Sequence, residues 1–458
     1  MLKAFAHQKA TTAFIQKNPK CLITSDPGTG KTRSVLDAYI QGKEDKGRLL
    51  VLAPLSILQA SWGEDILKFT NGLEYEIAYA RNRQKAFESD TPVVITNHDA
   101  VKWLLKNQVH LKDFNTICID EFTAFKNKDS QRSKALAKIV SNFKYRIGMS
   151  GTPNSNTILD IWHPCYVIDD GKRLGPKFYT FRSNVCTSRY NGFANEWVDK
   201  SNAEALVATA IKDINIRYKL EECLDMPPTS RRFVYTTLHK DIQLEYDTFE
   251  EESVLYTEES TINAVHAGAK VKKLLQLCTG AIYDEFGNVI KIHKERYDMV
   301  MSLIVERRHS LVAFNWRHER EQLVALAEKQ KIKYAVIDGQ TPSNKRADIV
   351  ERFQAGQLQC IFAHPQSTSH GLTLTKANTV IWSSPTYNAE HFQQFNRRIY
   401  RAGQTKRTEV ICIAARHTWE TEVYKKLEKK LTRMEDLLGT LNTLRKKHGR
   451  TNRQIQKT

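Results

Sequence analysis

Two separate stretches of this 458-residue chain alternate short apolar runs with amphipathic segments, and this repeated alternation limits the possible fold more than any other feature. Strands that alternate with helices form a parallel sheet that is covered on both faces. In the first stretch the strand candidates are Cys21–Thr24, Leu49–Ala53, Pro92–Thr96, Thr116–Ile119 and Arg146–Met149. In the second they are Leu311–Phe314, Tyr334–Ile337, Gln359–Phe362, Thr379–Trp382 and Glu409–Ile413. The sequence therefore predicts an α/β fold with two lobes, each built on a parallel sheet.

The stretch between the two alternating regions has a different pattern. It is rich in helical segments, with an acidic patch at Glu245–Glu259 and a basic one at Lys270–Lys273, both typical of solvated helix faces. We therefore predict four parts: a first lobe at 1–155, a helix-rich linking region at 156–300, a second lobe at 301–430 and a basic C-terminal helix or tail at 431–458.

A glycine-rich segment follows the first strand candidate and opens an amphipathic helix. It reads Ser25-Asp26-Pro27-Gly28-Thr29-Gly30-Lys31-Thr32. Glycines let backbone N–H groups turn around phosphates, and a helix N-terminus adds positive potential. The lysine would reach the β- and γ-phosphates and the final threonine would ligate Mg²⁺. The predicted nucleotide contacts are Gly28, Thr29, Gly30, Lys31 and Thr32, although the strict phosphate-loop pattern is not met in full, because its first glycine, five residues before Gly30, is absent.

Two adjacent acids end the strand candidate at Thr116–Ile119. Asp120 at the strand tip would hold Mg²⁺, and Glu121 would orient and deprotonate a water molecule. An Asp-Glu pair is a weak signal alone, but together with a phosphate loop it predicts hydrolysis of a nucleoside triphosphate. The first lobe is thus expected to be an ATPase lobe with ATP and Mg²⁺ as cofactors.

A second lobe can contribute arginine side chains that stabilise charge on the phosphates during hydrolysis. The segment from Gln393 to Gln404 contains Gln394, Arg398 and Arg401, and the two arginines would share one face if the segment were helical. The competing interpretation is a basic surface patch.

The charge balance indicates a polyanionic partner. Lys and Arg number 69 against 51 Asp and Glu, which gives a net charge of +18. Nucleic acid is the commonest such partner, although membranes and acidic proteins also bind basic chains. The last 18 residues, 441–458, carry six basic residues and no acid, and they are either a solvated end or a set of contacts to phosphates. The six are Arg445, Lys446, Lys447, Arg450, Arg453 and Lys457.

Several classes of protein are not expected. The sequence contains no run of 18 or more apolar residues, so no membrane-spanning helix is expected. The first residues do not resemble a signal peptide. The eight cysteines form no C-x-x-C pair, which argues against zinc and favours buried thiols in a reducing cytoplasm.

The order of the motifs resembles the Swi/Snf-type branch of helicase superfamily two, whose members have two RecA-like lobes. Phe5-Ala6-His7-Gln8 resembles the family's glutamine motif, which implies that Gln8 contacts adenine. Val51–Leu58 with Trp62 is similar to motif Ia, Ile95-Thr96-Asn97-His98 to motif Ib, and Asp120–Thr123 to motif II. Met149–Asn156 is similar to motif III, which implies that Ser150 and Thr152 couple the two lobes.

The resemblance continues in the second lobe. Ile337–Thr341 with Arg346 resembles the block after motif IV, and Ser367–Thr375 resembles motif V. The segment Gln394–Gln404 is similar to motif VI, which implies that Arg398 and Arg401 are paired arginine fingers and that Gln394 contacts the nucleotide. The nucleic-acid contacts that the resemblance implies are Pro54, Ser56, Thr96, Thr341, Gly371 and Thr373.

Some residues depart from the family pattern. Thr368-Ser369 stand where motif V usually has Gly-Gly, and Phe122-Thr123 replace the commoner Ala-His of motif II. Asp160–Tyr166 and Leu275–Ala281 resemble compact phage-encoded members of this branch, such as a tailed-coliphage helicase that handles branched DNA. For such a protein the host cytoplasm and a monomeric or weakly associating state are expected.

Three functions are compatible with these motifs. The leading prediction is an ATP-dependent translocase or helicase that remodels branched DNA, in fork remodelling or branch migration. The second is a duplex translocase that strips proteins or RNA polymerase from DNA, and the third is a weakly catalytic nucleic-acid-binding ATPase scaffold. The intact Lys31, Asp120, Glu121, Arg398 and Arg401 argue against the third, and RNA remains an alternative substrate.

Overall fold

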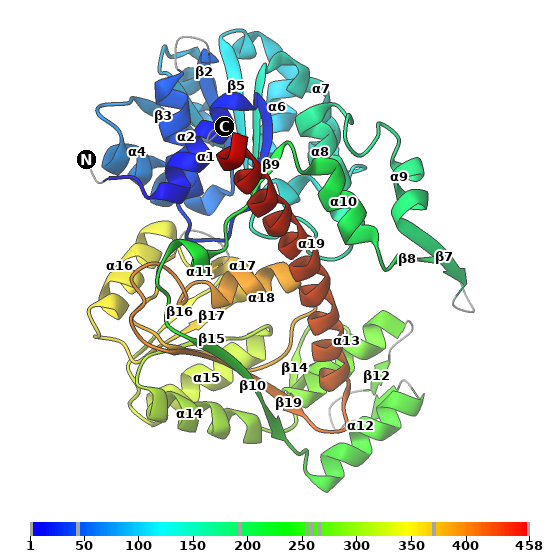
Figure 1. The fold of residues 1–458 in the computed structure, drawn as a ribbon. Coiled ribbons are helices and arrows are strands. Elements are labelled where there is room, and N and C mark those ends of the chain that lie inside the picture. The colour runs from blue at the N-terminus through cyan, green and yellow to red at the C-terminus, as the bar shows by residue number, and fades with distance from the viewer. Residues whose placement is uncertain are drawn as a thin grey trace. The chain divides into compact units, whose positions relative to one another are not determined.

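The chain folds into two compact units, which are described separately. The computed structural model describes residues 3–42, 46–190, 195–252, 254–256, 261–263, 267–368 and 372–455. Unit 1 comprises residues 1–225 and 430–458, and unit 2 comprises residues 226–429. Figure 1 follows the chain through both units by colour.

Unit 1 is built on a seven-stranded sheet with the order β3-β4-β2-β5-β6-β1-β9. Every neighbouring pair is parallel. The strands are β1 Lys20–Ile23, β2 Arg48–Ala53, β3 Tyr75–Ala78, β4 Val93–Asn97, β5 Phe114–Asp120, β6 Tyr145–Met149 and β9 Asn215–Ile216.

Helices surround this sheet. They are α1 Ala6–Lys17, α2 Lys31–Gln41, α4 Glu64–Phe69, α5 Arg83–Glu88, α6 Val101–Lys106, α7 Gln131–Ile139, α8 Trp162–Asp169, α9 Phe178–Val185, α10 Ala203–Ile211 and α11 Leu220–Cys223. An antiparallel hairpin of β7 Cys186–Tyr190 and β8 Asn195–Asp199 follows α9.

The central strands of unit 1 are buried on both faces, since consecutive residues point to opposite sides of a sheet and both are inaccessible. One face packs against α2, where Val35 and Leu36 join Val51 and Ile147 in a single core. On the other face Ile168 of α8 lies close to Gly148. Figure 1 shows α2 and α8 on opposite sides of the strands.

Unit 2 is built on a six-stranded sheet with the order β10-β19-β18-β15-β17-β16, again with every pair parallel. The strands are β10 Thr229–Thr236, β15 Ser310–Ala313, β16 Tyr334–Ile337, β17 Cys360–Ala363, β18 Thr379–Trp382 and β19 Thr408–Ala415. The helices are α12 Lys240–Glu252, α13 Ala267–Cys278, α14 Glu295–Arg307, α15 Arg317–Lys329, α16 Ser343–Gln354, α17 Pro365–Thr368 and α18 Ala389–Asn396. Two short hairpins pair β11 Val254–Tyr256 with β12 Thr261–Asn263, and β13 Ala281–Tyr283 with β14 Val289–Lys291.

The last helix, α19, runs from Trp419 to Ile455. Its residues up to Lys429 belong to unit 2, and those from Lys430 belong to unit 1. Near its end the Arg445 guanidinium lies 3.1 Å and the Lys446 ammonium 2.8 Å from the Glu222 carboxylate of α11. The side chains beyond Lys446 lie outside the described residues. At least two of the basic C-terminal residues are therefore paired with an acid of unit 1.

The predicted fold class is confirmed in two RecA-like lobes, each with a parallel sheet and helices. The stretch 156–300, predicted to be helix-rich, also contains the strands β7 to β14. Every strand that the apolar runs predicted is present. The six hairpin strands β7, β8 and β11 to β14 were missed, and so were β3, β9 and β10, which are edge strands of the two large sheets. The four-part division of the chain stays a prediction. None of the described helices is long and apolar enough to cross a bilayer.

Candidate functional site

The glycine-rich loop joins the end of β1 to the start of α2. Gly28 and Gly30 both have left-handed backbone conformations, with φ of 88° and 76°. A Cβ atom at Gly30 would also collide with the side-chain amide of Gln8. At Gly30 only glycine avoids both the unfavourable backbone conformation and the steric clash. The shape of the loop at the N-terminus of α2 therefore requires glycine at this position.

Lys31 is the first residue of α2, and its side chain folds back over the loop. Its Nζ donates to the Ser25 carbonyl at 3.0 Å and to the Asp26 carbonyl at 3.4 Å. Burial lowers the pKa of Lys31, and the nearby Glu121 and Asp120 carboxylates act in the opposite direction. The ammonium group is therefore held in the concave side of the loop, where an anion would complete its hydrogen bonds.

Asp120 ends β5 and is buried. Its Oδ2 accepts a hydrogen bond of 2.9 Å from the Trp62 indole, and a ring nitrogen of His98 lies 2.8 Å from its carbonyl oxygen. Burial raises the pKa of Asp120, whereas the Trp62 hydrogen bond and the Lys31 charge lower it. Trp62 and His98 thus fix this strand end, a role that sequence alone did not assign to either.

Glu121 follows with a left-handed backbone, φ 49°, which is uncommon for a residue with a side chain and clusters at functional sites. Its Oε2 accepts a hydrogen bond of 3.1 Å from the Ser150 hydroxyl. The Ser150 Oγ in turn accepts from the Thr152 N–H at 3.1 Å. Hydrogen bonds therefore connect Glu121, the predicted catalytic base, to Ser150 and Thr152, which were predicted to couple the lobes.

Gln8 lies against the same loop from α1. Its Oε1 accepts from the Phe5 N–H at 3.0 Å, and its Nε2 donates to the Thr29 carbonyl at 3.3 Å. A ring nitrogen of His7 lies 2.8 Å from the same carbonyl. The predicted contact of Gln8 with adenine stays a prediction, but Gln8 is in contact with the phosphate loop.

Asp26, within the glycine-rich loop, has a buried partner that the sequence did not reveal. Its Oδ1 lies 2.7 Å from Nη2 of Arg217, and its Oδ2 accepts from the Leu220 N–H at 3.0 Å. Arg217 also donates to the Thr24 carbonyl. A buried carboxylate in such a loop needs a cation, but nothing in the sequence says which of the 69 basic residues supplies it.

Replacing Arg217 with methionine is expected to destabilise unit 1 by about 3–5 kcal/mol, because the Asp26 carboxylate would stay buried without a cation. The double variant Asp26→Asn/Arg217→Met should recover most of this loss. Urea unfolding measures both, with Lys102→Met at an exposed pair as the control, expected to change stability by less than about 1 kcal/mol. A double variant as unstable as the single one would contradict the pairing.

In unit 2 the predicted arginine pair lies beyond the helix rather than within it. Helix α18 ends at Asn396, and Arg398 and Arg401 follow in turns. Nevertheless both donate to the Leu372 carbonyl, Arg398 at 3.2 Å and Arg401 at 2.8 Å. Gln394 is buried, and its carbonyl accepts from Arg398 Nε at 2.9 Å. The two segments that resemble motifs V and VI are thus tied together by a shared backbone oxygen.

The predicted nucleic-acid contacts have varied surroundings. Ser56 and Thr373 are exposed, and Pro54 and Thr341 are half-buried. Thr96 differs: it is fully buried, and its hydroxyl donates to the Ala78 carbonyl at 2.6 Å, so its side chain supports the sheet and faces no ligand surface. Gly371 lies outside the described residues.

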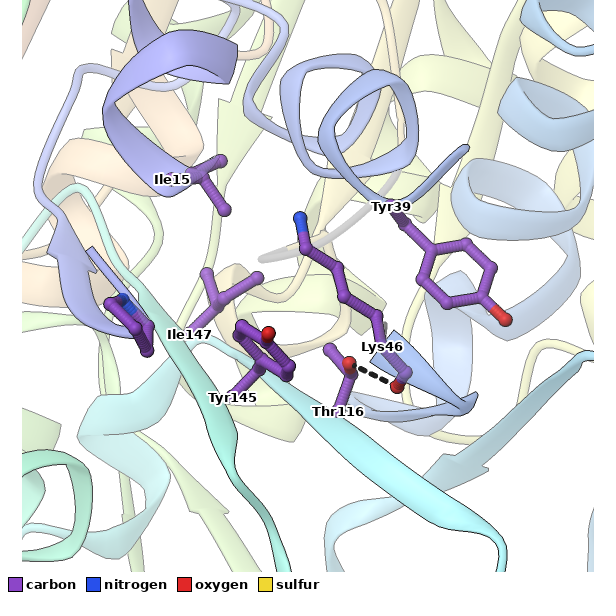
Figure 2. Close-up of a pocket in the computed structure, with 7 residues that line it drawn as sticks. Ile15, Tyr39, Lys46, Thr116, Tyr145 and Ile147 are labelled. Atoms are coloured by element: carbon purple, nitrogen blue, oxygen red, sulfur yellow. Dashed lines mark hydrogen bonds between the residues drawn. The ribbon is translucent and has the colours of Figure 1, made fainter. Parts of the chain in front are cut away.

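A small pocket in unit 1 is not part of this site. It lies at the opposite end of the strands, beside the start of β6 at Tyr145 and near Thr116 (Figure 2). The Lys46 ammonium group is buried there and donates to the Ala38 carbonyl at 2.7 Å, while the Thr116 hydroxyl donates to the Lys46 carbonyl at 2.8 Å. Lys46 thus caps the last turn of α2, and this role accounts for the buried lysine beside the pocket without a ligand.

The residues described here contain no group of three or more His, Cys, Asp or Glu that could hold a metal ion. Seven of the cysteines are buried and Cys223 is half-buried. Burial raises the pKa of Cys21 to about 12, in keeping with unreactive core thiols.

Comparison with known proteins gives two family matches. Residues 7–265 match the SNF2-related domain, and residues 295–403 match the helicase conserved C-terminal domain. Protein p41 of Acyrthosiphon pisum secondary endosymbiont phage 1 is 29% identical over 448 residues, which cover 90% of this chain and 92% of p41.

More distant relatives are longer than this chain. The human DNA annealing helicase and endonuclease ZRANB3 is 25% identical over 93% of this chain, which spans 40% of ZRANB3. The ATP-dependent helicase MG018 of Mycoplasma genitalium is 23% identical over 88% of this chain, which spans 38% of MG018. The solved SWI2/SNF2 ATPase core of Sulfolobus solfataricus, in complex with dsDNA, aligns with a TM-score of 0.45 at 19% identity, covering 96% of this chain and 94% of that core.

Proposed function

Because this chain belongs to the SNF2-related family and is a helicase-type ATPase, we propose that it couples ATP hydrolysis to movement along DNA and acts preferentially on branched DNA. The observation that carries the proposal is the hydrogen-bonded series from Glu121 through Ser150 to Thr152 beside Lys31 and Asp120. Through these hydrogen bonds, a movement of Glu121 on ATP hydrolysis would change the hydrogen bonding of the segment that contains Ser150 and Thr152, which lies outside the glycine-rich loop.

The loop residues divide the work of holding the triphosphate. Gly28, Thr29 and Gly30 present backbone N–H groups, and Lys31 exchanges its carbonyl partners for phosphate oxygens. The Thr32 hydroxyl and the Asp120 carboxylate are hard oxygen ligands, the kind that Mg²⁺ takes together with nucleotide phosphates. When bound, Mg²⁺ supplies neutralising charge at the β- and γ-phosphate oxygens.

Glu121 is assigned the proton chemistry. Its carboxylate is placed by Ser150, orients the attacking water and accepts its proton. Asp120 is assigned to Mg²⁺ and not to the water, and the Trp62 indole orients it by donating to its Oδ2. Gln8 is assigned to adenine, and Arg398 with Arg401 to the charge that develops on the transferred phosphoryl group.

DNA is supported as the track by charge and by family. The net charge of +18 favours a polyanion, and the human relative is named a DNA annealing helicase. The exposed Ser56 and Thr373, with Pro54 and Thr341, are proposed contacts to the sugar–phosphate backbone, which carries no sequence information. We expect the motor to act as a monomer or weak oligomer.

Comparison of DNA structures tests the substrate. We expect ATPase activity to be lowest without nucleic acid, higher with linear duplex, and highest with forked or four-way DNA of equal length. Turnover and half-saturating concentration are measured for each DNA at one salt concentration, since affinity for phosphates depends on salt. Equal stimulation by linear and branched duplex would instead favour the stripping of bound proteins, and no stimulation by any DNA would contradict the motor.

A further inference from the structure

Helix α9 and the β7–β8 hairpin carry large aromatic side chains on a surface outside the ATPase site. Tyr179 is 63% exposed and Tyr190 is 66% exposed, and Trp197 is half-buried between them and the hairpin base. Figure 1 shows β7 and β8 extending away from the sheet of unit 1, beyond α9. Exposed aromatic rings that lie close together on one surface are a candidate site for a ligand.

Cations alternate with these rings. The Arg182 guanidinium carbon lies 3.8 Å from the centre of the Trp197 ring and 5.0 Å from that of Tyr179. The Lys128 ammonium lies 5.4 Å from the centre of the Tyr179 ring and is paired with the exposed Asp129 at 2.7 Å. Positive groups therefore lie close to two of these aromatic rings.

The hairpin register adds Tyr190 to these groups. Ser188 pairs with Trp197 and Tyr190 pairs with Asn195. Because side chains alternate between faces along a strand, Tyr190 and Trp197 point to the same face as diagonal neighbours. We call the set of Lys128, Tyr179, Arg182, Tyr190 and Trp197 the aromatic platform.

The platform is fixed at its base. The Lys200 ammonium, just after β8, donates to the Ser183 and Asn184 carbonyls near the end of α9, each at 2.9 Å. The Asp199 carboxylate is almost inaccessible and lies 3.1 Å from Arg433. Hydrogen bonds therefore hold α9 against the hairpin base, and the ion pair connects the hairpin to α19, so that a ligand would meet rings already in position.

The exposed charges of this region are mainly positive. Between residues 177 and 200 the described cations are Lys177, Arg182, Arg189 and Lys200, and the described acids are Glu196 and Asp199. Asp199 is buried in its pair with Arg433, so Glu196 is the acid of this stretch that faces water. Outside the stretch, Asp129 is exposed but is paired with Lys128 of the platform. Exposed rings with a net positive charge suit a ligand that has both flat apolar faces and negative charge, as nucleic-acid bases and phosphates have.

We propose that the aromatic platform binds an unpaired nucleic-acid strand by stacking its bases on the exposed rings of Tyr179 and Tyr190. Bases in a duplex are stacked on each other and cannot use these rings, whereas unpaired bases can. The platform would therefore discriminate a fork, which offers single strands, from linear duplex. This preference rests on the proposed motor function, but the binding of a single strand does not.

The test is the double variant Tyr179→Ala/Tyr190→Ala, measured without ATP by fluorescence anisotropy. Probes are oligothymidine, oligouridine and a blunt duplex. We expect single-strand affinity to fall roughly fivefold or more for each ring removed, since stacking is tolerant of sequence and strong for every base. Duplex affinity should change less than twofold. Whether thymidine or uridine binds more tightly decides between DNA and RNA as the strand.

Two control variants isolate stacking. Tyr179→Phe/Tyr190→Phe keeps the rings and should retain single-strand affinity. Tyr79→Ala removes a tyrosine of the same unit that is 46% exposed, and it should leave all affinities unchanged. Equal losses on single strand and duplex, a loss in the phenylalanine variant, or unchanged single-strand binding in the alanine variant would each overturn the proposal. A wild-type protein whose ATPase ignores DNA but whose single-strand binding depends on the two rings would refute the motor and keep the platform.

Discussion

Lys31→Ala is expected to reduce ATP turnover by at least about 10²–10³-fold, the range for the loss of one preorganised charge-stabilising donor. In the structure the Lys31 ammonium is buried in the loop and bonded to two carbonyls that a triphosphate can replace. Its removal leaves the loop without its positive group, while the DNA contacts are spread over other basic residues. Steady-state ATPase and DNA affinity at one salt concentration are the measurements.

The matched control for this variant is Lys9→Ala, an exposed lysine on α1 of the same unit. It should leave turnover and DNA affinity near those of the wild type. If Lys31→Ala kept comparable ATPase activity, the assignment of the phosphate loop would be refuted. A large fall in DNA affinity in Lys31→Ala would show that the loop also takes part in binding the track.

Arg398→Ala is expected to lower DNA-stimulated turnover by on the order of 10³–10⁵-fold with a much smaller change in nucleotide affinity, as an arginine finger acts on the transition state. Arg401→Ala should have the same kind of effect, because both side chains are ordered by the Leu372 carbonyl. Turnover at saturating DNA and the half-saturating DNA concentration are measured together. A basic surface patch would give normal turnover and weaker DNA binding instead.

Two further variants separate catalysis from folding. Arg398→Lys keeps a positive charge but loses the planar fork of donors, so it should restore little turnover. Arg397→Ala removes a neighbouring arginine that lies over the Tyr400 ring, and it should change turnover only slightly. Since Arg398 is buried, its alanine variant is compared with the wild type in thermal unfolding. A loss of turnover that tracks a loss of stability would contradict the finger.

The ATPase motifs were accessible from the sequence because each is a contiguous segment. The glycines, Lys31 and Thr32 are adjacent in the chain, and Asp120 with Glu121 directly follows an apolar strand. Local order of this kind depends on backbone conformation within one turn or one strand end. The central strands were equally accessible, since burial on both faces demands runs such as Leu49–Ala53 that are apolar at every position.

The strands of the two large sheets that were missed are not apolar at every position. β3 and β10 lie at sheet edges and are partly exposed, so that charged and polar residues such as Glu76, Arg231 and Arg232 occupy them. An edge strand has a neighbour on one side only, and water replaces part of the apolar contact that marks a central strand. β9 has two residues, too few to form any pattern.

The sequence by itself determined the two parallel-sheet lobes, the glycine-rich loop and the acid pair at the end of β5, because these follow from the periodicity and spacing of neighbouring residues. Only the tertiary structure decided which Arg neutralises Asp26, that Trp62 holds Asp120, that Ser150 bonds to Glu121, and that Arg182 stacks on Trp197. Each of these contacts joins residues from different elements. The strength of these contacts depends on burial and charge at positions that lie far apart in the sequence and meet only when the whole chain has folded. A pattern of neighbouring residues cannot predict which of these positions will meet.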